Sequence, residues 1–190
     1  MEEIETIIGK SVAAMRRGGT ILYPTDTIWG IGCDATDAAA VDKIYAIKQR
    51  DHSKSMLILA LEEWVAIDNK VISDLFHADR PTTVIVPLAL LPTLPPIAAN
   101  LPAADGTIGV RVPRHAFCQS VLQQLGHPLV STSANFSGSP SPATYYDIDA
   151  NIIERVDYAV PNLDDFRSAS SVGSRIVKVE KDGSIVVIRN

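Results

Sequence analysis

The segment STSANFSGSP, residues 131–140, places small hydroxyl side chains directly after the apolar residues 128–130. Ser131 and Ser133 are two positions apart, so both side chains project to the same side of an extended chain. Hydroxyls and free backbone N–H groups at the end of a strand can hold an oxyanion, because open α/β sheets bind their ligands at that edge. An ordinary serine-rich turn with local side-chain to backbone hydrogen bonds would explain the same pattern.

A second candidate is the positively charged segment KQRDHSK, residues 48–54, in a chain whose formal net charge is -5. Lys48, Arg50 and Lys54 fall within this short segment. Arginine can grip an oxyanion through two parallel hydrogen bonds, whereas lysine acts as a point charge. The cluster therefore suits phosphate or carboxylate groups. Routine solvated charges on a surface loop are the alternative interpretation.

Arg111 is a charged residue inside the predicted strand TIGVRVP, residues 107–113. A charge in such a strand is costly unless it is paired or lies at the end of the sheet. Arg111 therefore either contacts an anionic ligand or holds a structural position, facing solvent or paired with an acidic residue.

The segment YPTDTIWGIGCDAT, residues 23–36, offers the hydroxyls of Thr25 and Thr27 on one side of the chain. The Gly-Ile-Gly at residues 30–32 predicts a flexible turn, and it lacks the third glycine of the dinucleotide-binding fingerprint. The GKS at residues 9–11 lacks the earlier glycine of a P-loop. A nucleotide site in this chain must therefore be of another kind.

Elements that could position these segments follow from the apolar patterns and their stop signals. Helices are predicted over residues 4–17, 37–48, 116–126 and part of 144–155. Strands are predicted over residues 20–24, 56–60, 82–87, 107–113 and 128–132, with a terminal hairpin of 174–180 and 184–190. Because the alternation is irregular and ends in a hairpin, the pattern predicts an α/β fold with a mixed sheet.

Composition narrows the class of protein. With 190 residues, 46% of them hydrophobic, residues 1–190 are predicted to form a single domain. The negative net charge gives no global signature of a nucleic-acid binder, and no segment is apolar enough to span a membrane. Cys33 and Cys118 are isolated and the histidines show no metal-ligand spacing, so neither a disulfide framework nor a metal site is predicted. A reducing, cytoplasmic location is expected.

Five motifs occur in a fixed order along the chain: YPTDTIWGIGCDAT, KQR followed by a lysine, RPTTVIV, TIGVRVPRH and STSANFSGSP. Together they resemble the YrdC-like family of threonylcarbamoyl-AMP synthases, over nearly the whole chain and in the short, single-domain bacterial form. The resemblance implies an α/β fold with an open twisted mixed sheet and flanking helices.

The resemblance also implies a reaction. In that family L-threonine and bicarbonate or CO2 give N-carboxy-threonine, which attacks the α-phosphate of ATP to form threonylcarbamoyl-AMP and pyrophosphate. A tRNA-modifying threonylcarbamoyl transferase complex then uses the product. Mg²⁺ is expected to accompany ATP, without a tightly bound metal site in the protein.

The resemblance also implies roles for individual residues, according to their positions in the matching motifs. The catalytic basic wall would be Lys48, Arg50 and Lys54. Threonine would be bound by Thr27, Arg111, Ser131 and Ser174. The nucleotide would be bound by Arg50, Lys54, Thr107, Ser133, Asn135, Ser141 and Arg189. The loops at residues 48–55 and 88–104 are candidate lids.

Two other functions remain open at this point. The chain could be a paralogue that binds tRNA or double-stranded RNA without synthase activity, in which case binding should depend strongly on salt. The second of these functions is a related carbamoyl-adenylate chemistry, although that activity usually belongs to one domain of a much larger protein. The basic cluster together with paired hydroxyls favours the synthase.

Overall fold

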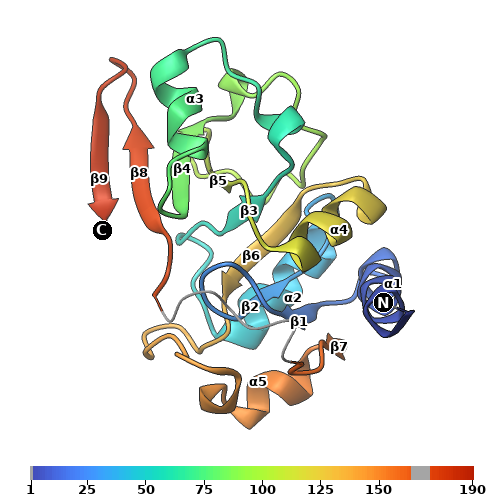
Figure 1. Ribbon diagram of the computed structural model, residues 1–190. Helices are drawn as coiled ribbons and strands as arrows, with labels where there is room; N and C mark the ends of the chain where they lie inside the picture. Colours follow the sequence, from blue (N-terminus) through green and yellow to red (C-terminus); the bar gives the residue numbers. More distant parts are fainter. Residues whose placement is uncertain (1, 164–171) are drawn as a thin grey trace.

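A nine-stranded sheet runs through the computed structural model, which describes residues 2–163 and 172–190 (Figure 1). The strands are β1 Ile21–Tyr23, β2 Gly30–Gly32, β3 Leu57–Leu59, β4 Thr82–Pro87, β5 Thr107–Arg111, β6 Leu129–Ser133, β7 Tyr158–Ala159, β8 Arg175–Val179 and β9 Ile185–Arg189. The helices are α1 Glu2–Arg16, α2 Ala38–Lys48, α3 Lys70–Phe76, α4 Ala116–Leu125 and α5 Ala150–Arg155. Short 3-10 helices cover Glu62–Val65, Leu88–Leu90 and Tyr145–Asp147.

The strand order is β7-β1-β2-β6-β3-β5-β4-β8-β9, and the sheet is mixed. Three pairs are parallel (β1 with β7, β3 with β5, β4 with β8) and the others are antiparallel. The sheet does not close on itself, since β7 and β9 form its two edges. The predicted open mixed sheet with flanking helices is confirmed.

The two faces of the central strands carry different side chains, because successive residues of a strand point to opposite faces. One face is apolar and fully buried, and its residues include Ile58, Val84, Ile108, Val110 and Val130. The opposite face presents smaller or polar side chains at several of the alternate positions, among them Thr83, Gly109, Arg111 and Ser131. A sheet with one wholly apolar face can leave the other free to form a site.

The helix boundaries follow from their capping residues. Asp37 caps α2, accepting hydrogen bonds from the N–H groups of Ala39 and Ala40. Gly126 ends α4 with a φ of 77°, a left-handed conformation that glycine adopts without strain. Helices α1 and α4 pack against each other beside the β1 end of the sheet, far from β9 (Figure 1). These predicted helices and the terminal hairpin are confirmed to within a few residues.

Residues 30–32 differ from the prediction. They form β2, a fully buried strand between β1 and β6, and not a flexible turn. A side chain at Gly32 would place its Cβ 2.3 Å from the carbonyl oxygen of Val130. Glycine is therefore required here by close packing between strands. With glycine at two of its three positions, β2 has too few side chains to show an alternating pattern.

The remaining unpredicted elements are short. Helix α3 has seven residues and β7 has two, below the length at which periodicity separates a helix or a strand from a loop. Within the described part of the chain, none of the helices combines the length and the apolar character needed to cross a membrane.

Candidate functional site

A cavity of about 400 Å³ lies on the polar face of the sheet. Strands β2 to β6, β8 and β9 all contribute to its lining, so it extends across most of the sheet. The sequence-predicted residues that line it are Thr27, Arg50, Thr107, Arg111, Ser131, Ser133, Ser141, Ser174 and Arg189. The fold thus gathers nine of the predicted side chains, from segments far apart in sequence, around one space.

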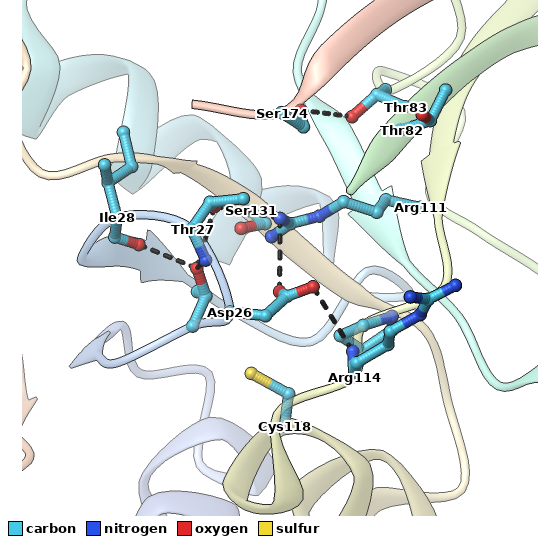
Figure 2. Close-up of polar contacts among 12 residues, drawn as sticks. Asp26, Thr27, Ile28, Thr82, Thr83, Arg111, Arg114, Cys118, Ser131 and Ser174 are labelled. Carbon is cyan, nitrogen blue, oxygen red and sulfur yellow. Dashed lines mark hydrogen bonds and ion pairs between the residues drawn. The ribbon is translucent and has the colours of Figure 1, made fainter. Parts of the chain in front are cut away.

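Arg111 is the most buried cation of this cavity, and it is held from one side. Its Nη1 lies 3.2 Å from Asp26 Oδ1 and donates a 2.8 Å hydrogen bond to Thr27 Oγ1 (Figure 2). Asp26 Oδ2 also accepts from the backbone N–H of Arg114 at 3.3 Å. The buried Nε of Arg111 has no hydrogen-bond partner among the described residues. A buried polar group without a partner is costly, so Arg111 keeps one hydrogen-bond donor that the described residues do not satisfy.

Thr27 is itself fixed by the loop that follows β1. The hydroxyls of Thr25 and Thr27 are 3.0 Å apart, and Thr25 also donates to the carbonyl of Ile28 at 2.8 Å. The loop residues 25–29 are buried, so their conformation is set by packing and not by solvent. This loop therefore presents the guanidinium of Arg111 in one orientation.

Hydroxyl groups continue across the cavity. On the far side, Thr83 Oγ1 and Ser174 Oγ are 2.8 Å apart (Figure 2). Thr107 donates a 2.6 Å hydrogen bond to Asp105 Oδ1. That bond, the backbone N–H of Thr107 and the neighbouring Lys178 lower the pKa of Asp105 to about 2, so the carboxylate stays ionised.

Positive charge dominates the described lining, in which four cations accompany a single carboxylate. The cations are Arg50, Arg111, Lys178 and Arg189, and the carboxylate is that of Asp105. Arg189 donates two hydrogen bonds to the carbonyl of Ser174, at 3.1 and 2.7 Å. Burial, with repulsion from Arg111 and Arg80, lowers the pKa of Arg189. An anionic ligand would relieve this repulsion.

Three predicted residues do not line the cavity: Lys48, Lys54 and Asn135. Lys48 is buried at the end of α2, and its Nζ donates to the carbonyls of Ser133 and Asn135, at 2.5 and 2.6 Å. The exposed Lys54 contributes its carbonyl, which accepts from Arg50 Nε at 2.9 Å. Asn135 donates to neighbouring carbonyls of its own turn. These residues hold the two loops in shape and place Arg50 and Ser133.

Sequence reasoning missed several residues that the structure brings to the site. Thr83, Asp105 and Lys178 line the cavity, and Asp26 holds Arg111 from behind. A signal existed for Asp26, because a charged strand residue such as Arg111 needs a counter-ion when it is buried. The other three are ordinary residue types within or just before strands, and their role depends on which strands become neighbours.

The arrangement can bind a ligand that carries several anionic groups. A carboxylate fits at Arg111, and phosphates fit among the cations nearer β8, β9 and Arg50. Among the described residues, no group of three or more His, Cys, Asp or Glu side chains could hold a metal ion.

Comparison with known proteins identifies the family of this chain. The model of the Sua5/YciO/YrdC family, described as "Telomere recombination", matches residues 13–190. A protein of Chromohalobacter salexigens named threonylcarbamoyl-AMP synthase is 35% identical over 166 residues, which cover 82% of this chain and 85% of that protein. A protein of the same name from Stenotrophomonas maltophilia is 32% identical, covering 80% of this chain and 84% of that protein.

Solved structures share the fold. YciO of E. coli matches with a TM-score of 0.74 and 25% identity, over 97% of this chain and 89% of that chain. Sua5 of P. abyssi, solved in complex with L-threonine, matches with a TM-score of 0.78 and 21% identity, over 96% of this chain and 53% of its own. With the family model matching nearly the whole sequence, the chain belongs to the Sua5/YciO/YrdC family.

Proposed function

We propose that this protein is a threonylcarbamoyl-AMP synthase, which makes threonylcarbamoyl-AMP and pyrophosphate from L-threonine, bicarbonate or CO2, and ATP. The amine of threonine takes up CO2, or bicarbonate with loss of water, to give a carbamate. An oxygen of the carbamate attacks the α-phosphorus of ATP, and the bond to the bridging oxygen breaks as pyrophosphate leaves. Relatives that cover at least four-fifths of this chain carry the name of this activity.

One structural observation carries the proposal. The same cavity contains a deeply buried arginine with an unpartnered Nε and three further cations, two on β8 and β9 and one in the loop after α2. The first suits the carboxylate of an amino acid, and the others suit a polyphosphate whose leaving group gains charge. Binding both reactants on one rigid sheet would set the attacking oxygen near the α-phosphorus, which is how positioning accelerates such a transfer.

The roles of individual residues are part of the proposal. Arg111 and Thr27 would bind the threonine carboxylate, with Ser131 and Ser174 nearby. Arg50, Arg189 and the hydroxyls of Thr107, Ser133 and Ser141 would bind the nucleotide. Lys48, Lys54 and Asn135 would act by holding the loops that carry Arg50 and Ser133, because their contacts are with backbone groups.

Mg²⁺ would bind to the phosphates of ATP and shield their charge. Asp105, ionised and on the cavity wall, is a carboxylate that could contact such an ion directly or through water. The product, a reactive mixed anhydride, would pass to a threonylcarbamoyl transferase complex acting on tRNA.

The test is pyrophosphate release from ATP with Mg²⁺ and bicarbonate, with and without L-threonine, and with serine and glycine as alternative substrates. Release that requires both threonine and bicarbonate is expected. Arg50→Met should reduce turnover at least about tenfold, since a charged hydrogen-bonding group on phosphate is lost. Arg16→Met, an exposed arginine on α1 outside the cavity lining, is the matched control.

Other outcomes would overturn the proposal. Threonine-independent release would indicate a different acceptor, and no release despite measurable ATP binding would indicate a paralogue that binds ligands without turnover.

A further inference from the structure

Tyr23 is fully buried, yet its hydroxyl reaches a residue of the cavity. Tyr23 Oη lies 2.7 Å from Ser131 Oγ, and Ser131 lines the cavity from β6. The two residues are not on neighbouring strands, because β2 lies between β1 and β6. The tyrosine ring therefore spans the width of a strand to make this contact.

The glycines of β2 leave room for the Tyr23 ring to reach from β1 to β6. Gly30 pairs with Tyr23 on one side and with Ser133 on the other. A Cβ at Gly30 would lie 3.4 Å from both Tyr23 Cζ and Ser131 Oγ, and one at Gly32 would lie 2.8 Å from Tyr23 Cε1. A side chain at either position would crowd the tyrosine. The Gly-Ile-Gly strand thus admits a ring that connects β1 to β6.

The direction of the hydrogen bond follows from burial. Burial raises the pKa of Tyr23, so the phenol keeps its proton. A buried O–H group needs an acceptor, and Ser131 Oγ is the hydrogen-bond partner that the described residues provide for it. Since tyrosine donates, the serine oxygen accepts, and the single proton of Ser131 is left for another partner.

We propose that Tyr23 is a positioning residue that turns the Ser131 hydroxyl into a hydrogen-bond donor toward the cavity. The chemical class of its partner is an anionic oxygen, a carboxylate or phosphate of the bound substrate, in keeping with the surplus of positive charge there. This role rests on the proposed function for the identity of that substrate. Without the phenol, the serine hydroxyl can rotate, and it can donate back into the protein.

A double-mutant cycle tests the inference, using Tyr23→Phe, Ser131→Ala and the pair together. Phenylalanine keeps the ring and its packing on Phe117, whose ring centroid is 6.4 Å away, and removes the hydroxyl alone. We expect Tyr23→Phe to lower kcat/KM about three- to tenfold, the effect of one hydrogen bond, and the double variant to match Ser131→Ala. Losses that add in the double variant would overturn the inference, because a merely structural tyrosine acts independently of Ser131.

Tyr158→Phe on β7 is the matched control, because it removes the same atom from a tyrosine outside the cavity lining. It should leave kcat/KM unchanged.

A second measurement separates this inference from the proposed function. If the wild-type protein releases no pyrophosphate, the function fails, and the cycle is read instead from ATP affinity by calorimetry. The Tyr23 hydroxyl proton is also observed directly by NMR, since a buried donating proton exchanges slowly. We expect its resonance in the wild type and its loss or a large shift in Ser131→Ala. An unchanged resonance in that variant would contradict the proposed hydrogen bond.

Discussion

At the scale of single residues, the site separates groups that face the ligand from groups that hold them. Arg111 and Thr27 line the cavity and are hydrogen-bonded to each other, while Asp26 holds the guanidinium from behind. Lys48 belongs to the second kind, because its ammonium connects the end of α2 to two carbonyls of the STSAN segment. A buried ammonium that donates hydrogen bonds to backbone carbonyls helps to fix the conformation of the loop. Its protonation state therefore affects the free energy of unfolding.

The free energy of unfolding should depend on pH through the titration of Lys48, and the direction of this dependence is predictable. Burial, with repulsion from Arg50, lowers the pKa of Lys48 to about 7 in the folded protein. Above that pH the unfolded chain binds more protons than the folded one, so stability contributed by this group rises with pH. Compared with Lys48→Met, the wild type should gain about 2 kcal/mol between about pH 7 and about pH 9.

Urea unfolding of both proteins across this range measures the difference, in which the other titrating groups cancel. A difference that stays constant would show that the lysine titrates normally, and one that falls as the pH rises would show that folding raises its pKa.

Several of these residues were predictable because their types were unusual for their places in the sequence. Arg111 within an apolar strand and paired serines after one stood out, and both line the cavity. The orientation of Lys48 was not predictable, because nothing in KQR tells whether an ammonium points at a ligand or at a carbonyl oxygen. Asp26 was recognisable only after the burial of Arg111 was known.

At the scale of elements, the strands differ in how strongly the sequence marks them. Strands β4, β5 and β6 were predicted from runs of β-branched residues, and helix α4 from its stripe and its glycine stop. Strand β2 left no such mark, because two of its three residues are glycines, which leave one of its faces without side chains. Its identity depends on tertiary packing between Val130 and Tyr23, which no local pattern contains.

Alanine substitutions at Gly32 and at Gly9 should change the free energy of unfolding in opposite directions. Gly32→Ala would place a methyl group 2.3 Å from the Val130 carbonyl oxygen, so backbone must move. A loss of about 3 kcal/mol or more in the free energy of unfolding is expected. Gly9→Ala is the control, since Gly9 is exposed within α1 and a Cβ there meets nothing within 4 Å.

Alanine at that helical position should stabilise the protein by about 0.5–1 kcal/mol. Thermal and urea unfolding of both variants give the comparison. Equal effects would mean that β2 tolerates a side chain and that its glycines have no packing role.

At the scale of the whole molecule, charge is distributed unevenly. The chain carries a formal net charge of -5, while the described lining of the cavity has four cations and one carboxylate. An anion is therefore attracted into the cavity from a surface that is otherwise negative on balance. A small polyphosphate can enter such a space, whereas a long polyanion must also lie against the acidic surroundings.

This distribution predicts weak binding of RNA by the free protein. Fluorescence anisotropy with labelled tRNA should give a dissociation constant above about 10⁻⁴ M at roughly 0.15 M salt, at the weak end of non-specific binding. ATP should still bind under the same conditions. Tight tRNA binding that weakens steeply with added salt would favour the RNA-binding function over the synthase.

The strand order has a kinetic consequence. Strand β1 pairs with β7, and β4 pairs with β8, so the sheet joins parts of the chain that lie far apart in sequence (Figure 1). Loop-closure entropy must be overcome before such contacts stabilise the fold, which makes folding slow. Arg189 lies on β9 and reaches its place in the cavity lining when β8 and β9 have docked. During synthesis on the ribosome, the complete site therefore forms only after the last strand has emerged.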